Sequence, residues 1–215
     1  MHNLFDSVVF DVDSTLVTIE GLDFLAKLKK KENKVKELTE KAMGGELSMR
    51  KSMKIKMKLL SPSYFDLVEM GKAYLNNITP GAKETVSNLR ENGLDVWIVT
   101  GNFQPAVGML AKYLSINKER VITNNIFFDK SNNYLGFDEE NPLSNNGGKV
   151  LVLKKFKKKM GKVVFVGDGS TDLETKRVAD LFIGFGGVVN RPAIQKQSRI
   201  YVTKLDLRAI LSYIF

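Results

Sequence analysis

Apolar residues form short runs along this chain, and several of the runs end abruptly in polar residues. Residues 8–10 are followed at once by Asp11 and Asp13, and similar apolar runs cover residues 94–99 and 162–166. A short apolar run bounded by turn residues is typical of a strand that is buried on both faces of a parallel sheet. The pattern therefore predicts buried strands that present polar side chains at their carboxyl ends.

A second pattern, with apolar residues three and four positions apart, runs from about residue 19 to residue 76 and predicts helices. Gly44-Gly45 and the Ser-Pro-Ser sequence at 61–63 break it into pieces. We expect a small helical cap subdomain, inserted after the first strand, and we expect ligand selection to be located there. The predicted boundaries are residues 17–77 for the cap and residues 1–16 with 78–215 for the core.

Strands and helices alternate through the rest of the chain. Residues 121–128 and 134–137 flank a polar loop and predict a β-hairpin appended to the sheet. The remaining predicted elements are strands at 181–187 and 200–202 and helices at 82–91, 104–114, 150–160 and 205–215. This alternation predicts an α/β fold with a doubly wound, mainly parallel, Rossmann-like sheet.

The composition is that of an ordinary globular protein. The 215 residues are 43% hydrophobic and 27% charged, which suits one large domain or a core with an insert. The apolar runs are far shorter than the roughly 20 residues that a membrane span needs. Because the first apolar stretch is brief and is interrupted by Asp6 and Asp11, we expect no signal peptide and no membrane partner, and we expect a cytoplasmic protein.

The available side chains limit the possible chemistry. Cysteine is absent, which excludes disulfides, thiolate metal sites and cysteine nucleophiles. The single histidine, His2, lies next to the N-terminus, which argues against a catalytic triad. Any chemistry must rest on carboxylates, lysines, hydroxyls and a hard metal ion, and magnesium is the favoured ion.

The net charge of +9 raises the possibility of nucleic-acid binding. The lysines are spread through the predicted helices, with local runs at 29–31 and 157–159, and few aromatic residues stand among them to stack on bases. We therefore favour a solvated basic surface over a nucleic-acid partner. Such a surface still attracts small anionic substrates.

Asp11 and Asp13 stand two positions apart at the end of the first strand, so they start out on the same face. When two carboxylates lie so close together, the ionisation of one opposes the ionisation of the other. The arrangement is stable when a hard cation binds the pair or when one carboxyl group keeps its proton. The alternative is a strand that simply ends in an Asx turn.

Other strands and loops carry further reactive residues. Thr100 and Gly101 follow the second predicted strand, Lys149 stands at a loop-helix junction, and Asp168 and Asp172 follow the third. Because the carboxyl ends of parallel strands share one edge of the sheet, these residues are expected to meet. Dinucleotide binding is disfavoured, since no Gly-x-Gly-x-x-Gly opens a helix after a strand.

Taken in order, these residues resemble the four-motif pattern of the haloacid dehalogenase superfamily. Within it, the matching runs are similar to those of phosphoserine phosphatases and cover nearly the whole chain. They are Asp-Val-Asp-Ser-Thr-Leu at 11–16, Glu-Gly at 20–21, Ala-Met-Gly-Gly at 42–45, Gly-Gly-Lys at 147–149, Gly-Asp-Gly-Ser-Thr-Asp at 167–172 and Phe-Ile-Gly-Phe-Gly-Gly at 182–187.

The resemblance implies a role for each motif. Asp11 would be the nucleophile that forms an aspartyl-phosphate, and Asp13 would be the general acid and then the general base. Magnesium would be held by the Asp11 carboxylate, the Asp13 backbone carbonyl and the Asp168 carboxylate, with Asp172 orienting a water or Lys149. The residues expected to bind the phosphoryl group and its surroundings are Thr100, Gly101, Asn102, Lys149 and Thr171.

The resemblance also implies how a substrate would be chosen. Glu20 matches the glutamate that binds the substrate ammonium, Lys56 stands where relatives have an arginine for the serine carboxylate, and Met49 stands at an apolar wall. The lysine ammonium is a point charge, whereas the arginine guanidinium can bind both oxygens of a carboxylate at once. Asn102 replaces the second glycine that relatives usually carry.

The expected activity is magnesium-dependent hydrolysis of O-phospho-L-serine, as in serine biosynthesis, by a monomer or a homodimer. One alternative is a phosphatase for another small phosphomonoester, such as phosphoethanolamine. A second is a receiver-type signalling module that stores a phosphoryl group on aspartate. Asp13 argues against storage, because an acid/base group beside the nucleophile hastens loss of phosphate.

Overall fold

The computed structural model describes residues 3–43 and 45–215. His2 and Gly44, which entered the sequence analysis, lie outside the described residues. The strands of the main sheet are β1 (Ser7–Phe10), β2 (Asp95–Phe103), β3 (Val121–Asn124), β6 (Val163–Gly167), β7 (Leu181–Phe185) and β8 (Ile200–Val202). They form one six-stranded sheet in the order β3-β2-β1-β6-β7-β8, and every neighbouring pair is parallel. The predicted doubly wound α/β fold is confirmed.

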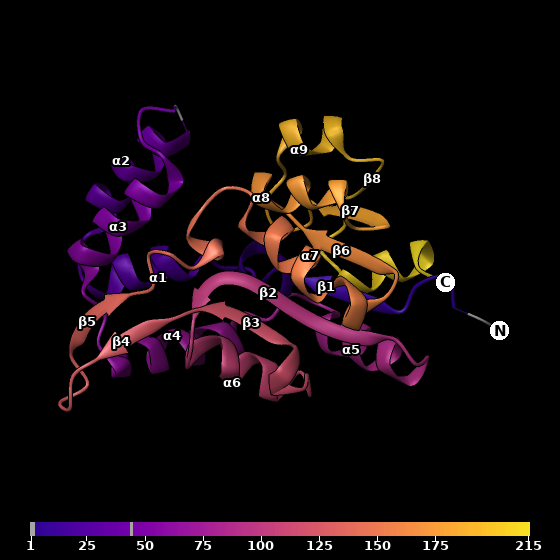
Figure 1. The fold of residues 1–215 in the computed structure, drawn as a ribbon, viewed down its shortest axis with the longest axis horizontal. Helices are drawn as coiled ribbons and strands as arrows, with labels where there is room; N and C mark the ends of the chain where they lie inside the picture. Colours follow the sequence, from indigo (N-terminus) through magenta and orange to yellow (C-terminus); the bar gives the residue numbers. More distant parts are fainter. Residues whose placement is uncertain (1–2, 44) are drawn as a thin grey trace.

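Helices cover both faces of this sheet (Figure 1). One layer contains α5 (Ala82–Glu91), α6 (Ala106–Tyr113) and the 3₁₀ helix Leu207–Tyr213, and the other contains α7 (Gly148–Met160), α8 (Ser170–Leu173) and α9 (Pro192–Gln197). Side chains of β1 alternate between the two layers, since Val8 and Phe10 join the first core while Val9 joins the second. Burial on both faces explains why the strands are continuous apolar runs.

The insert after β1 consists of α1 (Gly21–Leu28), α2 (Glu32–Met43), α3 (Met49–Leu60) and α4 (Tyr64–Asn76). These helices lie at the end of the molecule opposite the chain termini (Figure 1). Helix α4 packs directly on α6 of the core. A Cβ atom at Gly71 would lie 2.5 Å from the Sδ atom of Met109, so the missing side chain permits this close approach. One helix of the insert is therefore fixed to the core.

The predicted hairpin is shorter than expected and is not part of the main sheet. Residues 121–124 form β3, an edge strand of that sheet, and only β4 (Ile126–Phe128) and β5 (Tyr134–Phe137) pair as antiparallel strands. The hairpin lies against the insert, because Glu139, just after it, pairs with Lys54 of α3 at 2.9 Å. A register shift in β2 between Val99 and Phe103 interrupts the regular pairing with β3, and sequence periodicity does not show such a local change.

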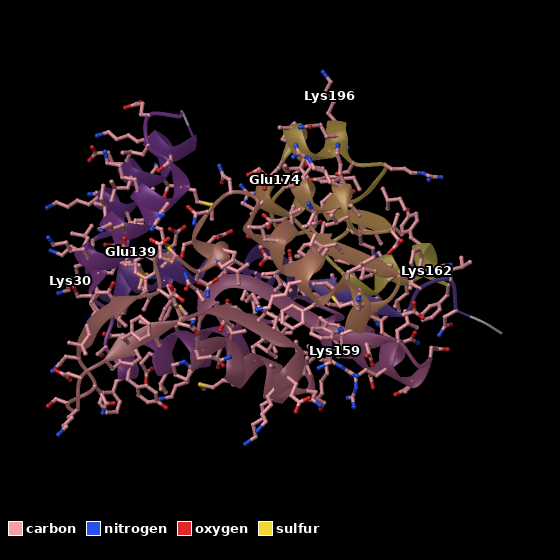
Figure 2. All side chains as sticks on the ribbon, in the orientation of Figure 1. Lys30, Glu139, Lys159, Lys162, Glu174 and Lys196 are labelled. Atoms are coloured by element: carbon pink, nitrogen blue, oxygen red, sulfur yellow. The ribbon has the colours of Figure 1, made fainter. Side chains whose placement is uncertain are left out.

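Charged side chains project into solvent at widely separated places, as the labelled Lys30, Lys159, Lys162 and Lys196 show (Figure 2). In the described ranges, 3–43 and 45–215, no helix is long and apolar enough to cross a membrane.

Candidate active site

The ends of β1 and β6 place three carboxylates together. Asp11 follows β1 directly, and its amide donates to the carbonyl of Val166 on β6 at 3.0 Å. Asp168 follows the last residue of β6, and Asp172 lies one turn further on in α8. Adjacent parallel strands in register therefore bring residues separated by more than 150 positions to one edge of the sheet.

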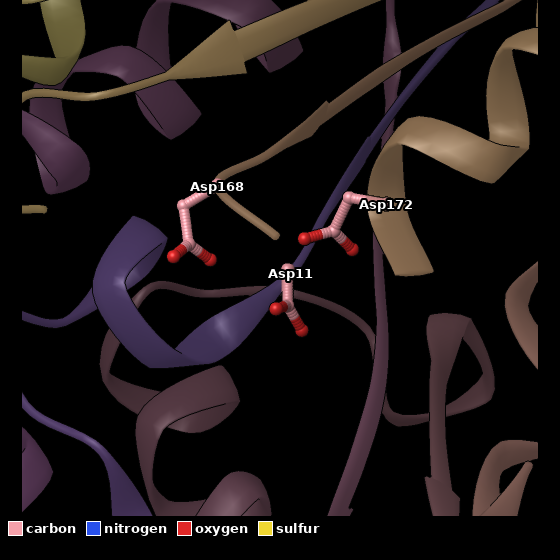
Figure 3. A group of neighbouring side chains, drawn as sticks. All are labelled: Asp11, Asp168 and Asp172. Carbon is pink, nitrogen blue, oxygen red and sulfur yellow. The ribbon is translucent and has the colours of Figure 1, made fainter. Parts of the chain in front are cut away.

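The side chains of Asp11, Asp168 and Asp172 lie next to one another (Figure 3), and one carboxylate oxygen of each lies within 4.8 Å of the others. All three residues are buried. Burial, followed by repulsion from Asp172 and Asp11, raises the pKa of Asp168 to about 7. Burial also raises the pKa of Asp172 to about 6, although Lys149 opposes the shift. Crowded, dehydrated carboxylate oxygens are ligands that suit a hard divalent cation, so the donor set fits the implied metal.

Lys149 supplies the positive charge inside this cluster. Its Nζ atom lies 2.7 Å from Asp11 Oδ1 and 2.5 Å from Asp172 Oδ1, and only 7% of the residue is exposed. Burial alone would lower the pKa of Lys149, but the two carboxylates outweigh it and raise the pKa. The ammonium stays charged, and it holds the Asp11 carboxylate in place.

The carboxylate of Asp13 takes a different direction from the three clustered acids. Its Oδ2 atom accepts the backbone N–H of Gly21 at 2.9 Å, and its Oδ1 atom accepts the hydroxyl of Tyr74 at 2.8 Å. The helical turn Val12–Leu16, with Ser14 in the left-handed region at φ 51°, breaks the strand geometry and carries Asp13 toward α1. Burial, then repulsion from Glu20, raises the pKa of Asp13 well above its usual value.

Glu20 lies at the N-cap of α1, beside Asp13. Its Oε1 atom accepts the Ser14 hydroxyl at 2.7 Å and lies 3.6 Å from an Arg191 nitrogen. Burial raises the pKa of Glu20, and the Ser14 hydroxyl and Arg191 oppose the shift. Arg191 also donates from Nε to Asp168 Oδ2 at 2.8 Å. One guanidinium thus connects the clustered acids to the insert.

The other predicted site residues lie on α3, β2 and α8. Burial lowers the pKa of Lys56 on α3, and the charges of Asp23 and Glu20 only partly oppose this shift. The Lys56 ammonium donates to Thr39 Oγ1 at 2.7 Å. Met49 begins α3, half-buried. The remaining predicted residues are buried Thr100 and Asn102 and half-buried Gly101 on β2, and half-buried Thr171 in α8.

The motifs predict no role for Tyr74 or Ser14. The family resemblance matches Arg191 to an arginine near the mouth of the site, although this residue taken alone is interpreted as structural. Tyr74 contacts Asp13 across 61 positions of chain, and nothing in its helical surroundings distinguishes it from a core residue. Arg191 follows the apolar strand-and-turn at 181–187 by four positions, so its place near the same sheet edge could be expected.

The haloacid dehalogenase-like hydrolase family model matches residues 5–180 of the chain, which include all four motifs. The chain belongs to this family. The hydrolase is 38% identical over 208 residues to the phosphoserine phosphatase of Bos taurus, covering 94% of the chain and 92% of the relative. It is 32% identical over 213 residues to the phosphoserine phosphatase of Methanocaldococcus jannaschii, covering 96% of each.

Solved structures show the same similarity. The hydrolase matches a substrate-bound phosphoserine phosphatase complex with a TM-score of 0.84 at 28% identity, covering 100% of both chains. It matches a phospho-aspartyl intermediate analogue of phosphoserine phosphatase with a TM-score of 0.82 at 29% identity, covering 98% of this chain and 99% of the other. The family resemblance found in the motifs is confirmed over the whole fold.

The metal-free hydrolase is expected to lose stability as the pH rises from about 4 to about 7. In the unfolded chain Asp168 and Asp172 lose their protons near pH 3.8, but in the fold their pKa values are about 7 and about 6. The folded state therefore binds more protons across this window, and rising pH favours unfolding by several kcal/mol.

Urea unfolding in chelator at several pH values measures this loss. The Asp168→Asn variant should show a shallower pH dependence, because one of the shifted groups no longer titrates. The pKa of Asp206 in the fold is about 2. Its titration therefore changes the free energy of unfolding only at lower pH, and it serves as an internal reference. A wild-type stability that rises between pH 4 and pH 7 would contradict the electrostatic account.

Proposed function

We propose that this hydrolase converts O-phospho-L-serine and water to L-serine and inorganic phosphate, with magnesium as its metal ion. The observation that carries the proposal is the buried Asp11 carboxylate, held by Lys149 at 2.7 Å beside two further acids, in a chain 38% identical to a phosphoserine phosphatase. A buried carboxylate fixed by an ammonium is oriented for attack on phosphorus.

In the proposed reaction, an Asp11 oxygen forms a bond to phosphorus while the bond from phosphorus to the serine oxygen breaks. Asp13 gives a proton to the departing serine oxygen, and it later takes a proton from the water that cleaves the aspartyl-phosphate. Asp13 suits this exchange because burial keeps its pKa well above that of a free carboxyl group. Lys149 and Thr100 would bind the phosphoryl oxygens as negative charge shifts onto them.

Magnesium would be held by Asp11, Asp168 and the Asp13 backbone carbonyl, with Asp172 positioning Lys149 through their 2.5 Å contact. When bound, the ion neutralises the phosphoryl oxygens and the crowded carboxylates. The donor set supports this role, because hard oxygen ligands from acidic side chains are what the ion prefers.

Substrate selection is proposed for the helical cap, residues 17–77. Glu20 would bind the substrate ammonium and Lys56 the carboxylate, with Met49 at the apolar wall. Lys56 lies close enough to Glu20 for the two charges to affect each other. A pair of opposite charges complements the two charged groups of an amino acid.

A second candidate substrate class is a small phosphomonoester without a carboxylate, such as phosphoethanolamine. The observation in its favour is Lys56, whose single ammonium is already bonded to Thr39 at 2.7 Å and lacks the bidentate geometry of arginine. A phosphate-release screen with magnesium over phosphoserine, phosphothreonine, phosphoethanolamine and simple sugar phosphates tests both. Equal rates on phosphoserine and phosphoethanolamine would favour the second class.

The Glu20→Gln substitution should lower kcat/KM for phosphoserine by roughly tenfold or more, because it removes the charge that faces the substrate ammonium. Hydrolysis of 4-nitrophenyl phosphate, which has no ammonium, should change less than about twofold. The Glu46→Gln variant is the matched control, since Glu46 is exposed in the loop between α2 and α3. Equal losses on the two substrates would assign Glu20 a structural role.

A further inference from the structure

The Asp13 carboxylate is held on several sides by hydrogen-bond donors. The Gly21 N–H donates to Oδ2 at 2.9 Å and the Tyr74 hydroxyl donates to Oδ1 at 2.8 Å. The groups converge tightly, because a Cβ atom on Gly21 would collide with the Tyr74 hydroxyl and lie 3.1 Å from Asn102 Oδ1. Donors on both oxygens fix the rotation of the carboxyl group.

Tyr74 is a rigid donor. Its side chain is fully buried, and α4 is anchored on α6 through the close contact at Gly71. A phenol has an ordinary pKa of about 10, so the Tyr74 hydroxyl keeps its proton at neutral pH. A protonated phenol facing a carboxylate donates its hydrogen bond. Its orientation is set before any substrate binds.

We propose that Tyr74 is a positioning residue of the reaction: its hydroxyl orients the Asp13 carboxyl group toward the oxygen of the leaving alcohol. Each Asp13 oxygen has a second lone pair, so the two hydrogen bonds leave room for the proton that is transferred. In this step the proton passes from Asp13 to the ester oxygen as its bond to phosphorus breaks. The inference rests on the proposed function, because it assigns Tyr74 to the same acid/base group.

The Tyr74→Phe variant tests the role, since it removes the hydroxyl and keeps the ring in the core. The ratio kcat/KM reports the steps up to departure of the leaving group. Phosphoserine releases an alkoxide that needs a proton, whereas 4-nitrophenyl phosphate releases a stable phenolate that does not. We expect kcat/KM to fall by about tenfold for phosphoserine and to change by less than about twofold for 4-nitrophenyl phosphate.

The matched control is Tyr113→Phe, because Tyr113 is 44% exposed on α6, away from the clustered acids; it should leave both substrates unaffected. Thermal unfolding of each variant checks that the fold persists. Equal losses on both substrates in a folded Tyr74→Phe variant, or no loss on either, would overturn the positioning role. A wild-type enzyme that releases phosphate from neither compound would instead refute the proposed function.

Discussion

Replacing Asp11 by asparagine should abolish turnover while leaving the fold intact. The amide nitrogen and oxygen occupy the same volume, but an amide is too weak a nucleophile to attack phosphorus, so kcat should fall by roughly 10³-fold or more. Folding should persist because the substitution removes one of three mutually repelling carboxylates. Phosphate release and circular dichroism measure the two effects.

The control for this substitution is Asp95→Asn, at the opposite end of the sheet, where Asp95 pairs with Arg120 at 2.6 Å. It should retain near-normal activity. Brief reaction with labelled phosphoserine should leave acid-stable label on wild-type protein and none on Asp11→Asn. Near-normal turnover in Asp11→Asn would eliminate the covalent mechanism.

Removing divalent cations with EDTA should lower activity by roughly 100-fold or more, and added magnesium should restore it. The expectation follows from the cluster of Asp11, Asp168 and Asp172, whose oxygens lie within 4.8 Å without enough positive charge to balance them. Magnesium should also raise the thermal unfolding temperature, because it binds only the folded arrangement of these carboxylates.

The rise in unfolding temperature with magnesium measures metal binding separately from catalysis. In Asp168→Asn the magnesium-dependent rise in unfolding temperature should shrink strongly, because one carboxylate ligand is lost. Asp206 lies in the C-terminal segment and pairs with Arg208 at 2.7 Å. In the Asp206→Asn variant, the magnesium-dependent rise in unfolding temperature should be unchanged. Full activity of the wild type in EDTA would exclude a metal from the reaction.

The element order and the clustered acids could be predicted because they follow from local rules. The apolar run 8–10 became β1, and the helix predicted at 82–91 is α5 with the same bounds. The carboxyl ends of neighbouring parallel strands lie at one edge of the sheet. Asp11 and Asp168 could therefore be expected to lie together before any side-chain contact was known. The extent of the hairpin was predicted wrongly, because the pattern at 121–128 does not show that β3 leaves the hairpin to join β2.

The fold class and the identity of the reactive groups could be read from the chain alone, because apolar periodicity and the motifs are local features of the sequence. The direction in which each group points depends on how distant segments pack. Asp13 was expected to share a face with Asp11, but the turn Val12–Leu16 carries its carboxylate to α1 and to Tyr74 of α4. That contact joins residues 61 positions apart, and only the packing of α4 on the core creates it.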